Sequence, residues 1–238
     1  MTAGLSSWLP LAATTLILIA IQLTIVARHP EPSADEPGSK DKPRYAELVT
    51  PAAVLGLGIV ALLGSLPISV LPVALRPAWV VWVSAGLVLV YVDARTTWLP
   101  ISATAFTAGC LSVAFAIGLV ADRSWWPQAM LRALVGAGLA WALFWMLWRW
   151  SGALGFGDVR LAALTGSVAG FGSTQWWFLA IFAGSVAAAC WGLITMAWRR
   201  RHPSPLGRAF PYGPGLWLGP WIAWVWLAWG GAVPTATS

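Results

Sequence analysis

The chain has 238 residues, of which 59% are hydrophobic and only 9% charged, and its mean hydropathy is +0.75. A soluble domain of this length needs far more charge to cover its surface, so the composition predicts an all-α membrane protein, a polytopic transmembrane helical bundle. A disulfide scaffold is excluded because the two cysteines, Cys110 and Cys190, lie inside apolar runs. The net charge of +6 does not indicate nucleic-acid binding, because the positive residues lie between apolar segments and are not clustered on a soluble face.

About eight apolar runs approach the roughly 20 residues that a membrane-spanning helix needs. In chain order they cover residues 8–27, 48–65, 78–97, 99–121, 129–148, 158–173, 176–198 and 216–234. The first run lacks a basic leader and a small-residue cleavage site, so we interpret it as a helix and not as a signal peptide. The boundary between the sixth and seventh runs, near Gly170, is the least defined.

Residues 28–47 separate the first two runs and are rich in proline and charge, which is typical of a flexible polar linker. We therefore divide the chain into an N-terminal helix with its cytoplasmic linker, residues 1–47, and a membrane domain, residues 48–238. No internal repeat is evident.

The distribution of lysine and arginine predicts the orientation, because cytoplasmic segments carry the excess of positive charge. With the N-terminus outside, the outer loops hold only Arg76, Arg123 and Arg132 of the 14 basic residues. The inner segments then hold Arg28, Lys40, Lys42, Arg44, Arg95, Arg149, Arg160, Arg199, Arg200, Arg201 and Arg208. An even number of spans puts the C-terminus outside as well.

The acidic residues narrow the search for a functional site. Those in the linker or at its edge are Glu31, Asp35, Glu36, Asp41 and Glu47. Asp122 lies in an outer turn beside Arg123. Only Asp93 and Asp158 remain, and the predicted orientation places both on the cytoplasmic side.

Asp93 follows an apolar run that is too short to cross a membrane, so we expect its helix to continue to about Thr97. The carboxylate then lies inside the last turns of a span. A negative charge there is disfavoured by low polarity and by the helix macrodipole. The alternative is an interfacial acid paired with Arg95 or another cation.

Asp158 opens the sixth span, where aspartate also has a structural role as a first-turn residue. Gly155 and Gly157 permit a tight turn before it.

Two carboxyls at one depth on one face of a bundle are what aspartyl proteolysis needs. One carboxylate takes a proton from water, and the other, protonated, hydrogen-bonds the scissile carbonyl. The sequence offers no competing nucleophile set or metal or cofactor site, because His29 and His202 fall in loops.

Three motifs resemble those of the type IV prepilin peptidase family, a group of GxGD membrane aspartyl peptidases. GFGDVRLAALTG, residues 155–166, resembles the GxGD signature. Asp93, followed seven residues later by Pro100, resembles the first aspartate box, and the segment from Phe210 to Pro214 resembles a third family segment. The motifs occur in the family's order, and the resemblance covers roughly residues 48–234.

The resemblance implies that Asp93 and Asp158 are the catalytic dyad. Gly155 and Gly157 would let the backbone bend so that Asp158 meets Asp93 and an extended substrate. A wall on the substrate side would consist of Pro211, Tyr212, Gly213 and Pro214, although an ordinary helix-entry turn is the alternative. The expected partners are prepilin or pseudopilin precursors, cut on the cytoplasmic side after a short basic leader, and the lipid bilayer; no cofactor is implied, and oligomer formation stays open.

The chain also departs from the family pattern. Many members carry Asn or Asp directly after the Leu-Pro pair, where this chain has Ile101. Larger bacterial members carry a methyltransferase region with two CxxC pairs, whereas this chain has no CxxC and its linker is short. We therefore expect a peptidase-only form without N-methylation.

Other side chains near the motifs have structural interpretations. Arg95 and Arg160 each follow an aspartate by two residues, an offset that turns them away from it on a helix, so we interpret them as topology anchors or headgroup contacts. Gly166 and Gly170 form a GxxxG pair suited to close helix packing. Trp217 begins a helical stripe of tryptophans that suits packing or lipid contact. Tryptophans that stand near run ends, as expected for the headgroup layer, are Trp8, Trp79, Trp98, Trp125, Trp126, Trp148, Trp176, Trp198 and Trp217.

A non-enzymatic protein is the alternative, either a catalytically inactive scaffold for assembly or a small transporter that uses the two acids for protons. A transporter is expected to place ionisable groups near the bilayer midplane on broken helices. Two carboxyls together at one rim would favour the peptidase, and separated or midplane acids would favour transport.

Overall fold

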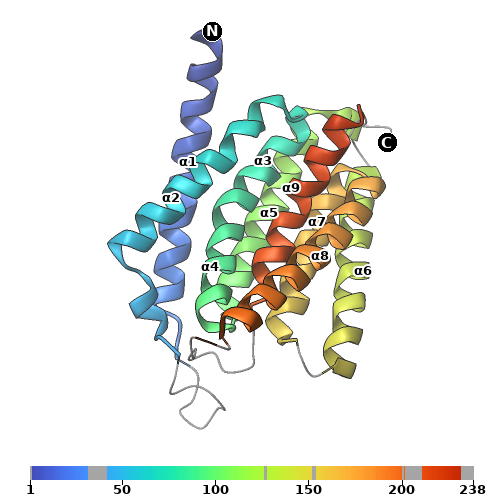
Figure 1. Cartoon of the computed structure of the whole chain (residues 1–238). Helices are drawn as coiled ribbons and strands as arrows, with labels where there is room; N and C mark the ends of the chain where they lie inside the picture. The colour runs from blue at the N-terminus through green and yellow to red at the C-terminus, as the bar shows by residue number, and fades with distance from the viewer. Residues whose placement is uncertain are drawn as a thin grey trace.

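The fold of the chain is an all-α helical bundle, as the composition predicts (Figure 1). The computed structural model describes residues 2–31, 42–125, 128–151, 154–199, 201 and 211–231. The α-helices of this part are α1 (Thr2–Ala27), α2 (Pro51–Ser65), α3 (Arg76–Val81), α4 (Leu87–Thr96), α5 (Ile101–Ala121), α6 (Gln128–Ser151), α7 (Phe156–Gly172), α8 (Thr174–Arg199) and α9 (Gly213–Trp229). A π-helical turn, Trp82–Gly86, joins α3 and α4 into one segment.

Six stretches in the described part are long and apolar enough to cross a membrane, and they run Leu9–Ala27, Pro51–Ile68, Val73–Thr96, Ile101–Ala121, Gln128–Ser151 and Thr174–Trp198. The helices α7 and α9, with 17 residues each, are shorter but run along the bundle beside the others (Figure 1). The expected helices are therefore present, with the third one beginning several residues earlier than predicted. Ser173 separates α7 from α8, and its hydroxyl accepts a hydrogen bond from the Trp176 N–H at 3.0 Å.

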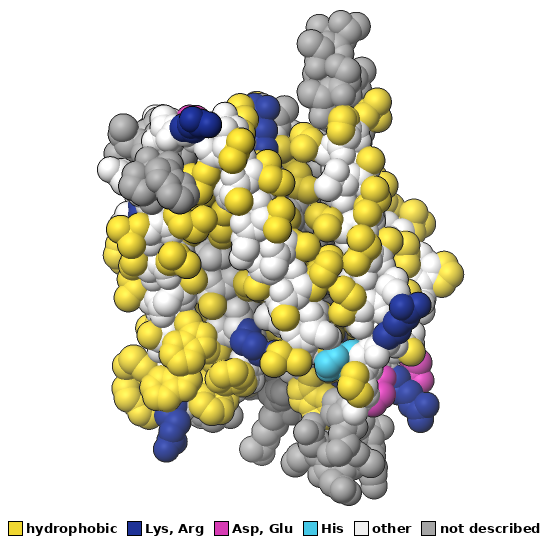
Figure 2. Space-filling view, turned by 180° about the vertical axis from the view of Figure 1, so that it is seen from behind, with side chains coloured by type: hydrophobic (Ala, Val, Ile, Leu, Met, Phe, Trp, Pro, Cys, Tyr) yellow, Lys and Arg dark blue, Asp and Glu magenta, His cyan; other side chains and the backbone are white. Residues whose placement is uncertain are grey.

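The segment Val73–Thr96 is the centre of the bundle. In its most apolar window 83% of the residues are buried, against 22% to 44% in the other five candidate spans. The start of α1 and the end of α9 lie at one end of the bundle, while α4 ends and α7 and α9 begin at the other (Figure 1). In Figure 2 the basic side chains gather toward the two ends of the face shown, and an apolar band lies between them. Because the start of α1 and the end of α9 lie at the same end of the bundle, the chain runs along the bundle an even number of times.

Glycines allow α7 to lie directly against α6. A Cβ atom on Gly166 would overlap the backbone of Gly136 and the side chain of Ala140, and a Cβ on Gly170 would overlap the Arg132 carbonyl. The GxxxG pair therefore packs as expected, with small residues letting two helix backbones approach each other. In the same way Gly215 brings α9 against α8 at Ala188.

Tryptophans hold α9 against the central segment. The indole N–H of Trp82 donates to the Trp217 carbonyl at 3.2 Å, and the indole N–H of Trp217 donates to the Trp82 carbonyl at 2.9 Å. The indole N–H of Trp176 donates to the Pro220 carbonyl at 2.8 Å.

The prediction that Trp79, Trp176 and Trp217 lie in the headgroup layer is therefore wrong, because their side chains are buried in the core. For Trp176 and Trp217 the physical reason is that the indole N–H donates to a backbone carbonyl inside the bundle. The Trp79 ring instead packs against the rings of Trp176 and Trp221. Packing, the other role considered for the stripe that begins at Trp217, is confirmed for that residue.

Substitution of Gly166 by leucine tests the close packing of α6 and α7. We expect Gly166→Leu to lower the free energy of unfolding by about 1–3 kcal/mol, because the side chain must push α6 away. Thermal unfolding in detergent measures the effect. Gly138→Leu on α6 is the matched control, since a Cβ there meets no atom within 4 Å. Equal melting temperatures for the two variants would contradict the proposed packing.

Candidate active site

Asp93 is buried at the end of α4, with 3% of its surface exposed. The helix ends at Thr96, close to the expected position, because Thr97 adopts the left-handed conformation with φ of 57°. The Thr97 N–H donates to the Asp93 carbonyl at 2.7 Å, which closes the last turn. The Asp93 carboxyl group therefore lies inside the last turns of the central span, as the sequence predicts.

The N-terminus of α9 supplies the partner of this carboxyl group. Gly213 is the first residue of α9, and its N–H donates to Asp93 Oδ2 at 2.8 Å. The positive end of the α9 dipole thus offsets the unfavourable dipole of α4. A Cβ atom on Gly213 would lie only 2.6 Å from the same oxygen, so a larger residue cannot take this place unless the carboxyl group moves.

Asp158 is the third residue of α7 and has 6% of its surface exposed. Its Oδ2 accepts a hydrogen bond from the Gly155 N–H at 3.0 Å, so the carboxyl group does cap its own helix. The other oxygen, Oδ1, is buried and accepts no hydrogen bond within the described part of the chain. Capping of α7, the structural role considered for Asp158, therefore uses only one of its two carboxyl oxygens.

The structure brings the two acids to the same end of the bundle. Asp158, at the start of α7, lies close enough to Asp93 to influence it electrostatically. Neither lies in the middle of its helix, since Asp93 belongs to the last turn of α4 and Asp158 to the first turn of α7. Acids at helix ends favour the peptidase over a transporter, for which ionisable groups are expected near the bilayer midplane.

The two glycines of the GxGD turn have different surroundings. Gly157 lies close to the loop that follows Asp93, since a Cβ there would lie 3.1 Å from the Leu99 Cβ and Leu99 would have to move by a few tenths of an ångström. Gly155 has φ of −80° and ψ of 154°, which any residue adopts, and a Cβ there would lie 3.7 Å from its nearest neighbour. The close approach of α7 to the Asp93 loop thus depends on Gly157.

Arg160 also ties α7 to this loop. Its Nη2 donates to the Leu99 carbonyl at 3.1 Å, and its guanidinium lies 5.8 Å from the centre of the Phe156 ring. The side chain is only partly exposed, and this bond gives it a role in joining two segments of the bundle, in addition to the topology-anchor or headgroup role considered for it. The physical reason is that the carbonyls of an irregular loop at this depth need donors, and Arg160 supplies one.

The segment Pro211–Pro214 lies at the site. Its Gly213 binds Asp93, and the Tyr212 ring packs edge-on against Phe144 with 5.8 Å between ring centres. Burial raises the pKa of the Tyr212 phenol; a hydrogen bond with Ser185 opposes this shift and the nearby Asp158 charge adds to it. Tyr212 therefore keeps its proton beside the acids. Phe210 lies outside the described residues.

Lys42 is the residue at the site that sequence reasoning missed. Its Nζ donates to Thr97 Oγ1 at 2.9 Å and lies 3.8 Å from the centre of the Trp98 ring, in the loop that follows Asp93. Residues 42–48 pack on the bundle, with Tyr45 buried, while residues 32–41 of the expected linker lie outside the described part. A lysine in a segment rich in charge and proline carries no signal that would distinguish it from a solvated one.

A polar cavity of about 510 Å³ lies next to the loops that flank the acids, and neither carboxyl group is part of its lining. The loop that follows Asp93, the GxGD turn and the end of α1 surround it. Its lining residues are His29, Pro30, Tyr45, Thr97, Trp98, Leu99, Pro100, Ile101, Gly155, Phe156, Gly157 and Arg160. The cavity is large enough for a short stretch of extended peptide.

Comparisons with known proteins point to the same region. A segment of 102 residues is 34% identical to the prepilin leader peptidase/N-methyltransferase of Pseudomonas putida, and it spans 42% of this chain but only 33% of that protein. No solved structure gives a significant match. Residues 80–193, which include both Asp93 and Asp158, match the type IV leader peptidase family, and this confirms the family resemblance of the motifs for that part of the chain.

Proposed function

We propose that this chain is a membrane aspartyl endopeptidase that removes the short basic leader from type IV prepilin-like precursors at the cytoplasmic face. The observation that carries the proposal is the pair of buried carboxyl groups at one end of the bundle, each held by a backbone N–H. The match to the leader peptidase family over both aspartates supports the substrate class.

The geometry suggests how the two acids divide the reaction. Two carboxyls that interact in a poorly solvated site share one proton, so one is ionised and one is protonated. The ionised carboxyl takes a proton from water as the oxygen attacks the peptide carbonyl carbon, and the protonated carboxyl hydrogen-bonds the carbonyl oxygen. The carboxyl that took this proton then donates it to the amide nitrogen as the tetrahedral intermediate collapses, so that the C–N bond breaks and the leader leaves with a new carboxyl group and the mature protein with a free amine. Asp158 Oδ1, which has no partner within the described residues, is the oxygen that we assign to the water.

We assign the polar cavity to the extended segment around the cleaved bond. Substrate would lie between the loop after Asp93 and the Gly155–Gly157 turn, and we assign Tyr212 and Gly213, which lie outside the cavity lining, to the wall next to Asp93. The chain as given has two cysteines, Cys110 and Cys190, and no CxxC pair, so the proposal includes cleavage without N-methylation.

Two non-enzymatic functions remain as rivals. For a transporter, the ionisable groups are expected near the midplane on broken helices, whereas Asp93 and Asp158 lie at helix ends. A scaffold would need no pair of buried, interacting acids, whose burial is costly without a function. The leader peptidase assignment therefore accounts for more of the site.

Substitution of each aspartate tests the dyad. We expect Asp93→Asn and Asp158→Asn each to slow cleavage of a prepilin-type precursor by at least about 100-fold, because each removes a proton acceptor or donor of the reaction. The measurement is the rate of leader removal by purified protein in liposomes. Asp122→Asn, in an exposed turn, is the control and should cut at the wild-type rate. Full activity of either dyad variant would end the aspartyl assignment.

Substitution of Gly213 tests the contact between α9 and Asp93. We expect Gly213→Ala to slow cleavage by about 100-fold with little change in the melting temperature, because the new methyl group displaces the Asp93 carboxyl from its place. Gly230→Ala at the other end of α9, where a Cβ has 3.5 Å of space, provides the matched control. Activity of Gly213→Ala close to that of Gly230→Ala would show that the contact is not needed.

The two glycines of the GxGD turn should respond differently to alanine. We expect Gly155→Ala to retain activity within about twofold and Gly157→Ala to lose about tenfold, because only the second substitution pushes on Leu99. Rates for the two variants, measured on one precursor, give the comparison. A larger loss for Gly155→Ala would contradict the role that we derive from the backbone.

A further inference from the structure

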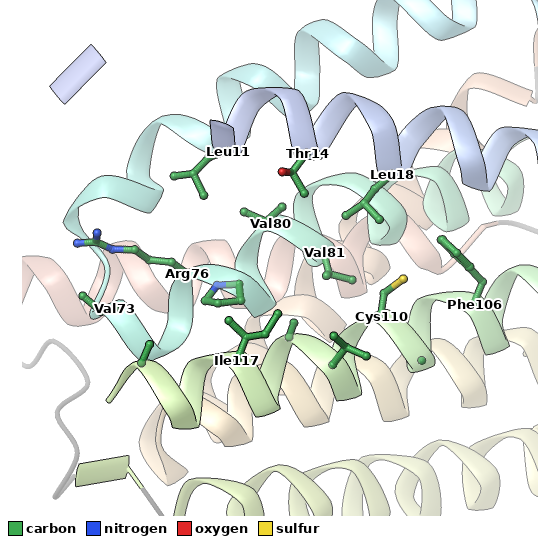
Figure 3. A pocket seen from close by; sticks show the side chains of 15 residues that line it. Leu11, Thr14, Leu18, Val73, Arg76, Val80, Val81, Phe106, Cys110 and Ile117 are labelled. Atoms are coloured by element: carbon green, nitrogen blue, oxygen red, sulfur yellow. The ribbon is translucent and has the colours of Figure 1, made fainter. Parts of the chain in front are cut away.

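Two cavities in the described part of the chain differ in what they can select. An apolar groove of about 780 Å³ lies between α1, α3 and α5, where Leu18 of α1 faces Cys110 of α5 (Figure 3). Its walls expose few polar atoms, so they distinguish poorly between apolar occupants. The polar cavity next to the acids differs, because one of its walls already holds a charged side chain of the chain itself.

This wall is the loop that follows Asp93. The Trp98 N–H donates to Oγ1 of the buried Thr96 at 3.1 Å, which fixes the backbone that carries the indole. The Thr97 hydroxyl donates to the Thr96 carbonyl at 2.6 Å. Thr97 and Trp98 both line the polar cavity. The loop therefore holds a hydroxyl oxygen and an aromatic ring in defined positions at the cavity.

The chemistry of these two groups selects a cation. A hydroxyl has one proton, and the proton of Thr97 goes to the Thr96 carbonyl, so Oγ1 offers only lone pairs to a further partner. The face of an indole ring carries negative charge density and attracts an ammonium or guanidinium group. A carboxylate, in contrast, finds no donor in this hydroxyl or in the ring face.

Lys42 occupies the cation site formed by Thr97 and Trp98. Its Nζ lies 2.9 Å from Thr97 Oγ1 and 3.8 Å from the centre of the Trp98 ring. The segment that follows Lys42 is held on the bundle, since the Tyr91 hydroxyl donates to the Leu48 carbonyl at 2.8 Å. Lys42 is not among the residues that line the polar cavity, so it fills the cation site and leaves the cavity itself open.

We propose that Thr97 and Trp98 form a subsite for a basic side chain of the substrate leader, and that Lys42 occupies this subsite until the leader displaces it. The inference rests on the proposed function, in which an extended segment of a precursor lies in the polar cavity. The subsite belongs to the wall of that cavity, so a leader residue near the cleaved bond can reach it. Because Lys42 is tethered to the same chain, its effective concentration at the subsite is high, and it competes with the substrate.

Cleavage of two precursors tests the subsite. One precursor has lysines in its leader, and the other has glutamine in their place. We expect wild type to cut the lysine precursor with about tenfold higher kcat/KM, Trp98→Leu to prefer it by less than about twofold, and Trp98→Phe, which keeps an aromatic face, to retain most of the preference. Each variant is compared with itself on two substrates, so a general loss of activity does not imitate the result. A wild-type preference in Trp98→Leu would overturn the proposal.

Lys42→Met tests the competition between Lys42 and the leader. We expect this substitution to lower KM for the lysine precursor by about fivefold, because the subsite is then empty, and to change KM for the glutamine precursor by less than about twofold. Arg44→Met is the matched control, because it removes the same charge from an exposed residue of the same segment and should keep the wild-type KM. An unchanged KM in Lys42→Met, or an equal fall in Arg44→Met, contradicts Lys42 as the occupant.

Acetylation of Lys42 separates this inference from the proposed function. A leader peptide with dimethylated lysines keeps its positive charge and one N–H on each lysine, but it does not react with an acetylating reagent. We expect this peptide to raise the acetylation rate of Lys42 by about threefold, because the rate follows the fraction of chains in which Lys42 is displaced. Mass spectrometry measures the rate, and the glutamine peptide should leave it unchanged.

The two experiments fail in different ways. If wild type cuts neither precursor, the proposed function is wrong, but faster acetylation of Lys42 with the dimethylated peptide alone still supports the subsite. If the dimethylated peptide leaves the acetylation rate unchanged, or if the glutamine peptide raises it equally, the subsite is wrong even when the precursors are cut.

Discussion

The hydrogen bond from the Gly213 N–H to Asp93 is the contact on which the candidate site depends. It joins two segments that are 120 residues apart in the chain, and both of its partners are buried. A carboxyl group at the C-terminal end of its own helix would otherwise meet only carbonyl groups and low polarity. The beginning of α9 must therefore reach Asp93, and the glycine permits that approach.

Much of the packing around α9 maintains this contact. The reciprocal indole bonds of Trp82 and Trp217 fix α9 against the central segment, and the Trp176 bond to the Pro220 carbonyl fixes it against α8. Gly215 lets the first turns of α9 lie on the α8 backbone. The site thus lies where one helix ends and two begin, and the amide ends of α7 and α9 face the two carboxyl groups.

The sequence was sufficient to predict the bundle, the helices and the two acids that lie at one end of it. Apolar runs near 20 residues define membrane helices directly, and buried acids are conspicuous in a chain with so little charge. It was not sufficient for contacts between distant segments. The role of Lys42 depends on where a polar segment packs, and the interior position of Trp79 depends on tertiary contacts with Trp176 and Trp221. The contact of Arg160 could not be predicted because its partner, the Leu99 carbonyl, lies 61 residues away in the chain.

The π-helical turn Trp82–Gly86 has a consequence for how sequences of this kind are compared. A π-turn holds one residue more than a regular helical turn, and removal of one residue converts it into a regular turn. The central segment can therefore be one residue shorter at this point while Arg76 and Asp93 keep their directions. A deletion elsewhere in the segment turns one end relative to the other by about 100°. Homologous chains can thus differ in length at this turn with no change in the direction of Asp93.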